Sequence, residues 1–258
     1  MECWHMSGAG NDFMVIDARG KQLDFEKMAK DLCARTGADG FMAVDYSDKA
    51  DFRLHFYNSD GSRGEMCGNG SRCICRFAYE HGIAGENMVV ETDAGLVPGK
   101  RLTESQYLVN LNNPGIADLN RLPGVAYIEL GCPGVPHAVT ELEKLSWDDA
   151  EALRERAKEL RFSPAFPKGA NVNFFTRIGE NRLRVMTYER GVEDYTLACG
   201  TGCGSTASAL WLRGELPGGE LTLENKGGIL KVRVQGSGGK IESLLLEGPT
   251  EIVRIYEI

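Results

Sequence analysis

The chain has 258 residues, of which 42% are hydrophobic and 26% charged, so it can bury the core of one large domain or of two smaller ones. Its formal net charge of −8 opposes binding to nucleic acid or to an anionic membrane, because those partners select basic surfaces. No apolar run is long enough to span a bilayer, and the first residues do not resemble a signal peptide. We therefore expect a cytoplasmic protein with no membrane partner.

The eight cysteines of the chain are expected to be reduced thiols in that compartment. No Cys-x-x-Cys pair occurs, and the spacing of Cys67, Cys73 and Cys75 is a poor match to the spacing of zinc ligands. The sequence therefore predicts no metal site.

In the first half of the chain, the pattern predicts a helix over 23–35 with Asp24 as its N-cap. A second helix over 71–81 follows Cys67 and carries so few charges that we expect it to be buried on most sides. Strands are predicted at 41–46, 52–57, 87–92 and 106–111.

Turn residues at 112–115 mark a predicted boundary, after which the same plan repeats. A helix is predicted over 146–160, with Ser146 and Asp149 spaced as a capping box, and a small-residue helix over 201–213 follows Cys199. Strands are predicted at 126–130, 171–176, 183–188, 221–224, 228–234, 241–246 and 252–256. This pattern predicts an α+β fold of two similar lobes, residues 1–112 and 113–247.

The most informative feature is a short motif that occurs once in each half. Cys67 opens a Cys-Gly-Asn-Gly sequence and Cys199 opens a Cys-Gly-Thr-Gly sequence, each just before a predicted helix. A helix N-terminus stabilises a nearby thiolate through the macrodipole and the unpaired N–H groups. Two such cysteines facing each other predict one base and one acid on opposite sides of a substrate atom, an arrangement that inverts a stereocentre.

Further motifs surround the two cysteines in a fixed order along the chain. They are His5-Met6-Ser7-Gly8-Ala9-Gly10-Asn11-Asp12-Phe13, Phe56-Tyr57-Asn58-Ser59-Asp60-Gly61, Met66-Cys67-Gly68-Asn69-Gly70-Ser71-Arg72-Cys73, Pro136-His137-Ala138-Val139, Asn171-Val172 and Glu189-Arg190-Gly191. Together with the motif at Cys199, they resemble the diaminopimelate epimerases, a family of cofactor-independent racemases. The resemblance covers nearly the whole chain.

The resemblance implies a fold and an assembly. It implies two pseudo-symmetric lobes, each a central apolar helix wrapped by mainly antiparallel strands, with the active site in the cleft between them. It also implies that a last strand within 248–258 returns to the first lobe, that the protein forms a homodimer, and that it needs no cofactor.

The resemblance also implies catalytic roles by position. Cys67 and Cys199 would be the two acid/base groups, with Cys199 removing the α-proton of the LL substrate and Cys67 returning a proton to the other face. His137 and Glu189 match positions that support the protonation states of the cysteines. From the residues alone, a lone histidine such as His137 is more often an ordinary loop residue.

Substrate binding is implied in the same way for a molecule that is a zwitterion at both ends. Side chains that match its amino and carboxylate partners are Asn11, Asn58, Asn171 and Arg190, and Glu189 matches the partner of the distal ammonium. Backbone N–H groups at the helix starts would converge on the α-carboxylate, from Gly68, Asn69, Gly200 and Thr201. Asn11 and Asn58 also lie beside glycines, where turn formation is the plainer explanation.

Two departures from the family pattern leave the substrate open. Val135 stands where many members carry an asparagine that helps to bind the distal end of the substrate, and the segment 190–196 is one residue longer than usual. The alternative is therefore a two-cysteine racemase of another amino acid, for example histidine. A binding protein or a thiol redox protein is a third hypothesis, which the retention of both cysteines and the lack of Cys-x-x-Cys oppose.

Overall fold

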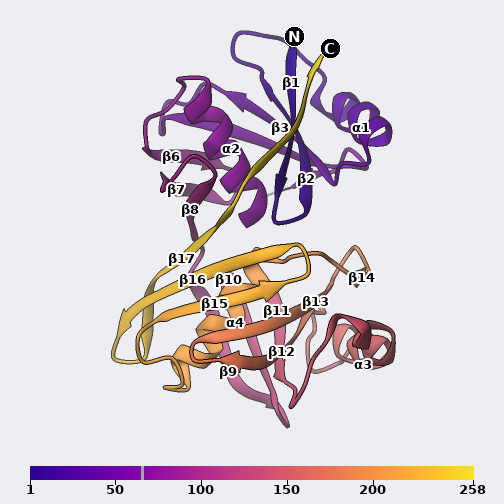
Figure 1. Ribbon diagram of the computed structural model, residues 1–258, viewed down its shortest axis with the longest axis vertical. Coiled ribbons are helices and arrows are strands. Elements are labelled where there is room, and N and C mark those ends of the chain that lie inside the picture. Colours follow the sequence, from indigo (N-terminus) through magenta and orange to yellow (C-terminus); the bar gives the residue numbers. More distant parts are fainter. Residues whose placement is uncertain (65–66) are drawn as a thin grey trace. The chain divides into compact units, whose positions relative to one another are not determined.

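The computed structural model describes residues 1–64 and 67–258 (Figure 1). Met66, at the start of one of the motifs above, lies outside the described residues. The chain forms two compact units, one from residues 1–110 and 247–258 and the other from 111–246. Both units are of the α+β class, as the sequence predicts.

The described residues form four α-helices, two in each unit. Their bounds are α1 Phe25–Thr36, α2 Gly68–Glu80, α3 Ala150–Arg161 and α4 Gly200–Leu212, and a 3-10 helix at Trp147–Asp149 precedes α3. The Asp24 carboxylate accepts a hydrogen bond from the Lys27 N–H, so it caps α1 as predicted. The capping box of Ser146 and Asp149 is also present.

The first unit is a mixed sheet. Its strands are β1 Glu2–Gly8, β2 Asn11–Asp17, β3 Gly40–Asp45, β4 Phe52–Asn58, β5 Arg63–Gly64, β6 Asn87–Thr92, β7 Gly95–Arg101, β8 Gln106–Leu111 and β18 Glu251–Glu257. Strands β2 and β3 are parallel, as are β4 and β6, and the other pairs are antiparallel. The last strand, β18, runs antiparallel along β1.

The second unit contains the strands β9 Pro114–Leu122, β10 Val125–Gly131, β11 Gly134–Glu141, β12 Asn171–Gly179, β13 Arg182–Glu189, β14 Asp194–Tyr195, β15 Glu220–Asn225, β16 Gly228–Ser237 and β17 Lys240–Pro249. Here β11 and β12 are parallel, as are β13 and β15. The remaining pairs, β9 with β10, β10 with β11, β12 with β13, β13 with β14 and β15 with β16, are antiparallel.

The two units therefore repeat one topology. The series β1 to β7 with α1 and α2 has the same order and the same parallel and antiparallel pairings as the series β10 to β16 with α3 and α4. Each series places one apolar helix directly after the short strand that follows its fourth long strand. The pseudo-symmetric lobes that the sequence predicts are thus confirmed at the level of topology.

The central helices α2 and α4 are buried along most of their length. Every residue from Gly68 to Ala78 is buried, and so is nearly every residue from Gly200 to Leu210. The guanidinium of Arg76, in α2, donates a hydrogen bond of 2.8 Å to the Thr250 carbonyl. This burial explains the low charge of both helix sequences. Their small side chains also allow the strands to approach each helix closely.

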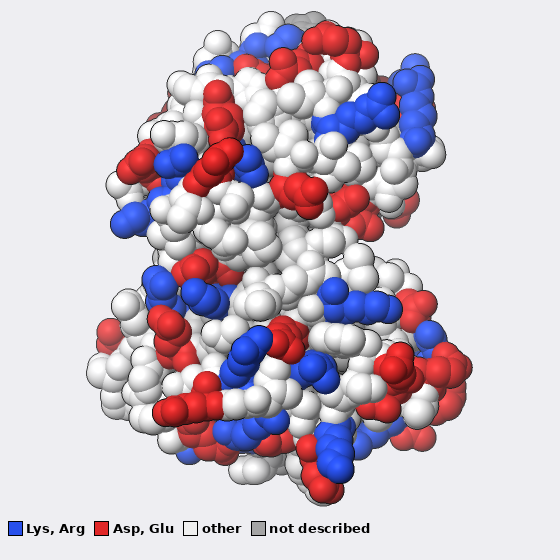
Figure 2. All heavy atoms as spheres, viewed as in Figure 1, with Lys and Arg blue, Asp and Glu red and all other residues white. Residues whose placement is uncertain are grey.

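The surface carries charges of both signs. On the face drawn in Figure 2, basic side chains are interspersed with acidic ones over both units. Many form ion pairs, such as Arg177 with Glu141. Within the described ranges, none of the helices is both long and apolar enough to cross a membrane.

Candidate active site

Cys67 occupies the N-cap position of α2 in the first unit. Its backbone is extended (φ −130°, ψ 121°), and its carbonyl accepts the first helical hydrogen bond from the Ser71 N–H at 2.7 Å. Its thiol is only partly buried and lies 3.6 Å from Oδ1 of Asn11. The structure therefore places the sulfur of one predicted acid/base group beside one predicted substrate-binding side chain.

Asp39 fixes the direction of the Asn11 amide. The Asn11 Nδ2 donates to Asp39 Oδ2 at 2.6 Å, and the Asp12 N–H donates to the same oxygen at 2.8 Å. The amide oxygen of Asn11 therefore faces Cys67. Sequence reasoning did not identify Asp39, because it precedes β3 and is far from Asn11 in the chain.

Asn58 has the turn-forming role that its neighbouring glycine suggests. Its Nδ2 donates to Ser62 Oγ at 2.9 Å, and its N–H donates to the Ser62 carbonyl. The side chain of Asn69, in the first turn of α2, accepts a hydrogen bond from the buried Arg72 at 3.0 Å. Arg72 also donates to the Gly68 carbonyl at 3.2 Å, so this arginine braces the start of the helix.

Cys199 occupies the equivalent position at the start of α4 in the second unit. Its backbone is also extended (φ −119°, ψ 109°), and its carbonyl accepts from the Cys203 N–H at 3.0 Å. The sulfur accepts a hydrogen bond from the Gly202 N–H at 3.3 Å and lies 3.5 Å from the Thr201 hydroxyl oxygen. Gly200, which lies between Cys199 and Thr201 in the chain, is buried.

The environment of Cys199 favours the thiol over the thiolate. Burial first, and then the Glu189 carboxylate, raise the pKa of this thiol well above its usual value, while the contacts with Thr201 and Gly202 oppose the shift. The Gly202 N–H at the start of α4 favours the thiolate, as expected for a helix N-terminus, but burial and the Glu189 carboxylate outweigh this effect. A protonated sulfur beside a carboxylate is instead a pair that can pass one proton between its members.

His137 lies in the middle of β11 and is completely buried. Its Nδ1 is 3.1 Å from the Asn173 Nδ2. Burial first, and then the positive charge of Arg190, lower the pKa of His137 to about 3, so the imidazole is neutral at ordinary pH. The plainer reading of His137 as an ordinary loop residue is therefore wrong.

Asn171 joins the strands on either side of it. Its Nδ2 donates to the Pro136 carbonyl at 3.2 Å, and its Oδ1 accepts from the Arg190 N–H at 2.8 Å. The Arg190 guanidinium is exposed and donates to the Lys168 carbonyl at 2.9 Å. The structure thus brings Asn171 and Arg190 together near the His137 strand.

Glu129 is a buried acid that sequence reasoning missed. It pairs across the strands with Pro136, accepts from Lys168 Nζ at 2.8 Å and accepts from the Tyr127 hydroxyl. The signal that could have identified it is an acidic residue inside an otherwise apolar strand. It lies on the strand next to the one that carries Val135 and His137.

Four other cysteines are core residues. Burial raises the pKa of Cys3, Cys73 and Cys75 to about 12 and that of Cys33 to about 11. These thiols stay protonated and behave as small apolar side chains. In the described part of the chain, no group of three or more His, Cys, Asp or Glu side chains is placed to hold a metal ion.

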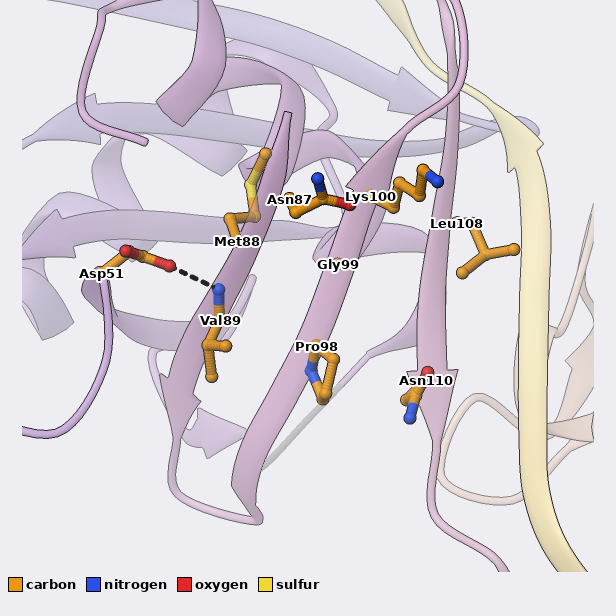
Figure 3. A pocket seen from close by; sticks show the side chains of 9 residues that line it. All are labelled: Asp51, Asn87, Met88, Val89, Pro98, Gly99, Lys100, Leu108 and Asn110. Carbon is orange, nitrogen blue, oxygen red and sulfur yellow. Dashed lines mark hydrogen bonds between the residues drawn. The ribbon is translucent and has the colours of Figure 1, made fainter. Parts of the chain in front are cut away.

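A pocket of about 350 Å³ lies elsewhere, over β6, β7 and β8 of the first unit (Figure 3). Its lining includes Asp51, whose carboxylate accepts from the Val89 N–H at 2.7 Å, and Lys100. None of the predicted site residues lines it. The pocket is therefore separate from the groups described above.

Comparison with known proteins identifies the family. The model of the family described as diaminopimelate epimerase matches residues 3–113 and 132–253. The diaminopimelate epimerase of Aquifex aeolicus is 39% identical over 233 residues, which cover 83% of this chain and 82% of that protein. The diaminopimelate epimerase of Archaeoglobus fulgidus is 36% identical over 251 residues, with 89% and 88% covered.

Solved structures share the fold at much lower identity. A phenazine biosynthesis protein of the PhzF family from Bacillus anthracis has a TM-score of 0.74 at 16% identity, with 100% of this chain and 98% of that chain covered. A hydroxyproline epimerase from Agrobacterium vitis has a TM-score of 0.71 at 16% identity, with 99% and 91% covered. With the family model matched over most of its length and relatives well above 30% identity, the chain belongs to the diaminopimelate epimerase family.

Proposed function

We propose that this protein is an isomerase that interconverts LL- and meso-diaminopimelate without a cofactor. The observation that carries the proposal is the repetition of one catalytic element, a cysteine at the N-terminus of a buried helix, in two units of the same topology. Membership in the family supports the choice of substrate. In this proposal the product, meso-diaminopimelate, serves the synthesis of lysine and of peptidoglycan precursors.

The proposed reaction moves one proton off the α-carbon and another onto its opposite face. In the LL-to-meso direction, Glu189 takes the proton of the Cys199 thiol, and the resulting thiolate removes the α-proton of the substrate. The Cys67 thiol then gives its proton to the other face of the carbanion, which inverts the centre. In the reverse direction the two cysteines exchange roles.

The chemical difficulty is the very low acidity of the α-proton, since a free thiol has a pKa of only about 8.5. The start of each central helix supplies N–H donors, at Gly68 and Asn69 in one unit and at Gly200 and Thr201 in the other, for the carboxylate on which negative charge develops. One partly buried helix terminus contributes up to about 2 kcal/mol. Orientation of the substrate and exclusion of water from the site supply the rest in this proposal.

The remaining site residues hold the ends of the substrate in this proposal. Arg190 pairs with a carboxylate, because its guanidinium is exposed and already fixed by Lys168. Asn11, Asn58 and Asn171 supply neutral donors and acceptors. His137 supports the protonation state of the reacting groups.

One observation favours a second candidate, a racemase of a different amino acid such as histidine. Val135 is a partly buried valine in β11, two residues before His137, and it offers no hydrogen bond to a distal amino or carboxylate group. If that end of the substrate is not recognised, the two cysteines could serve an amino acid with a different side chain.

Exchange in D2O separates these candidates. The purified enzyme is incubated with LL-diaminopimelate and, separately, with L-histidine and other L-amino acids, and deuterium uptake and inversion are followed by NMR and chiral chromatography. We expect inversion of diaminopimelate, with solvent deuterium at the inverted carbon. Inversion of only some other amino acid would refute the choice of substrate while leaving the two-cysteine chemistry in place.

The proposal extends to the context of the enzyme. We infer a cytoplasmic homodimer, in line with the expectations drawn from the sequence, with the amino-acid substrate as its small-molecule partner. Sedimentation equilibrium of the purified protein tests the oligomeric state, and a single species with the mass of one chain would contradict the dimer.

A further inference from the structure

A chain of buried polar side chains joins His137 to the strands beneath α4. Asn173 on β12 and Thr187 on β13 are directly paired, and both are almost completely buried. The Thr187 hydroxyl donates to Asn173 Oδ1 at 3.0 Å. Asn173 Nδ2 lies 3.1 Å from His137 Nδ1 and 3.1 Å from the Ala138 carbonyl oxygen.

The Ala138 carbonyl fixes which end of the Asn173 amide faces it. A backbone carbonyl oxygen can only accept a hydrogen bond, so the atom of Asn173 beside it must be the NH2 nitrogen. The second hydrogen of that nitrogen is then directed to His137 Nδ1, which must accept it. The Thr187 hydroxyl fits the same orientation, because it donates to the amide oxygen on the other side.

This hydrogen bond selects one form of the imidazole. A neutral histidine whose Nδ1 accepts carries its proton on Nε2. An imidazolium would instead place an N–H group against the N–H of Asn173. Burial first, and then the positive charge of Arg190, lower the pKa of His137 independently of this contact, so they also favour the neutral imidazole.

The Nε2 atom of His137 is buried and has no hydrogen-bond partner within residues 1–64 and 67–258. A buried donor without a partner is unfavourable. The unpaired Nε2–H of His137 therefore indicates a position where an acceptor is present only when substrate is bound. The acceptor must be able to meet an N–H group inside the protein, and an anionic oxygen or sulfur meets that need best.

We propose that Asn173 is a positioning residue that holds His137 in the neutral Nε2–H form, so that His137 donates a hydrogen bond to an anionic acceptor when substrate binds. The acceptor is either a carboxylate of the substrate or a cysteine thiolate. His137 then stabilises negative charge and does not itself carry the α-proton. This inference deepens the proposed function and rests on it for its catalytic consequence, whereas the form of the imidazole can be tested without turnover.

Gly202 connects this network to the reacting sulfur. A Cβ at Gly202 would lie 2.2 Å from Asn173 Oδ1, and the Gly202 N–H donates to Cys199 Sγ. The first turn of α4 therefore rests on the Asn173 amide. The Asn173 side chain thus contacts both the His137 imidazole and the start of α4, where Cys199 lies.

The test is NMR of the intact protein labelled with 15N-histidine. The chain has four histidines, and the signals missing in His137→Gln identify those of His137. We expect a protonated Nε2 and an unprotonated Nδ1 that do not change between about pH 5 and about pH 9, across the range in which an ordinary histidine titrates. A protonated Nδ1, or titration of His137 in that range, would overturn the proposal.

Asn173→Asp is the diagnostic variant, since a carboxylate accepts where the amide donated. It should move a proton onto His137 Nδ1 and lower kcat about 10–100-fold, the loss seen when the partner that fixes a metal-bound histidine is removed.

Asn225→Asp is the matched control, a buried asparagine of the same unit that contacts Cys203. Thr187→Val should keep the Nε2–H form, because the Ala138 carbonyl still orients the amide. An unchanged imidazole in Asn173→Asp would contradict the proposal.

The acceptor is identified by adding LL-diaminopimelate to the wild type and to a Cys67→Ala, Cys199→Ala double variant. A shift of the His137 Nε2–H signal in both proteins assigns a substrate carboxylate, and a shift in the wild type alone assigns a thiolate. No shift in either would overturn the donor role. If His137 has the Nε2–H form but the protein does not epimerise diaminopimelate, the proposed function is wrong and this inference stands. If His137 titrates in an enzyme that is active on diaminopimelate, this inference is wrong and the proposed function stands.

Discussion

Cys199 and His137 show how burial at single residues outweighs local sequence signals. The N-terminus of α4 favours a thiolate, yet burial and Glu189 keep Cys199 protonated. His137 is held neutral by the same loss of solvent. The identities of both residues were predictable from motifs. Their protonation was not, because it depends first on how deeply the fold buries each side chain.

The two cysteines of the motif should differ from those of the core in what their removal changes. Cys67→Ala and Cys199→Ala should each lower kcat by at least about 10²-fold, since each removes a general acid or base. Cys33→Ala and Cys75→Ala should mainly lower the free energy of unfolding. Steady-state kinetics and urea unfolding measure the two effects. Near-normal turnover of Cys67→Ala or Cys199→Ala would contradict the assignment.

The neutral His137 should make stability depend on pH. Its pKa is about 3 in the folded protein and 6.5 in the unfolded chain, so below 6.5 the unfolded state binds more protons and stability is lost as the pH falls towards 3. From pH 7.5 to 5.5, this group alone should cost about 1.4 kcal/mol. Urea unfolding of the wild type and of His137→Gln at both pH values tests this. Equal losses in the two proteins would show that His137 has an ordinary pKa.

At the scale of elements, the helices were predicted better than the strands. The cap at Asp24 and the capping box at Ser146 are local signals, and both are confirmed. Strands β1, β2 and β11 were missed, because long parts of them are buried on both faces and so lack the alternation that reveals a strand. Strand β7 was missed for another reason, since it contains glycine and proline, which usually mark turns.

The contacts that orient site residues could not be predicted in the same way. Asp39 orients Asn11 and Asn173 orients His137, and the members of each pair are about 30 residues apart or more. Motif spacing carries no information about such pairs, because they form only when the strands align.

The start of α4 should be sensitive to a single methyl group. Gly202→Ala would bring a Cβ within 2.2 Å of the Asn173 amide oxygen, so the helix start or the amide must move. We expect a loss of about 1–3 kcal/mol in unfolding free energy together with a fall in kcat. Gly218→Ala, where nothing lies within 4 Å of the added atom, is the control and should be neutral. Unfolding curves that coincide for both variants and the wild type would contradict the tight packing.

At the scale of the molecule, the first unit is completed by the end of the chain. Strand β18 runs along β1, and the Ile258 N–H donates to the Met1 carbonyl at 2.9 Å. No residue of β18 is fully buried, so backbone pairing carries much of its attachment. The topological repeat of the two units was predictable from the two cysteine motifs and the similar order of elements. The division at residues 110 and 247 came from the contacts of the folded chain.

Removing β18 should therefore loosen one unit selectively. In a variant that ends at Thr250, β1 loses β18, one of its two antiparallel partners, while Arg76 keeps the Thr250 carbonyl. Hydrogen exchange followed by mass spectrometry should show faster exchange in β1 and β2 and little change in β10 to β13. Uniformly faster exchange in β1, β2 and β10 to β13 would contradict this selective effect.

The proposed mechanism requires two sulfurs that act on one carbon, and a disulfide between them tests this requirement directly. Mild oxidation should link Cys67 to Cys199 in a disulfide, detectable by peptide mass spectrometry, and abolish epimerisation of LL-diaminopimelate. Reductant should restore activity in step with the loss of the linked peptide. Full activity with that disulfide intact, or inactivation by oxidation that never links these two cysteines, would contradict the two-cysteine mechanism.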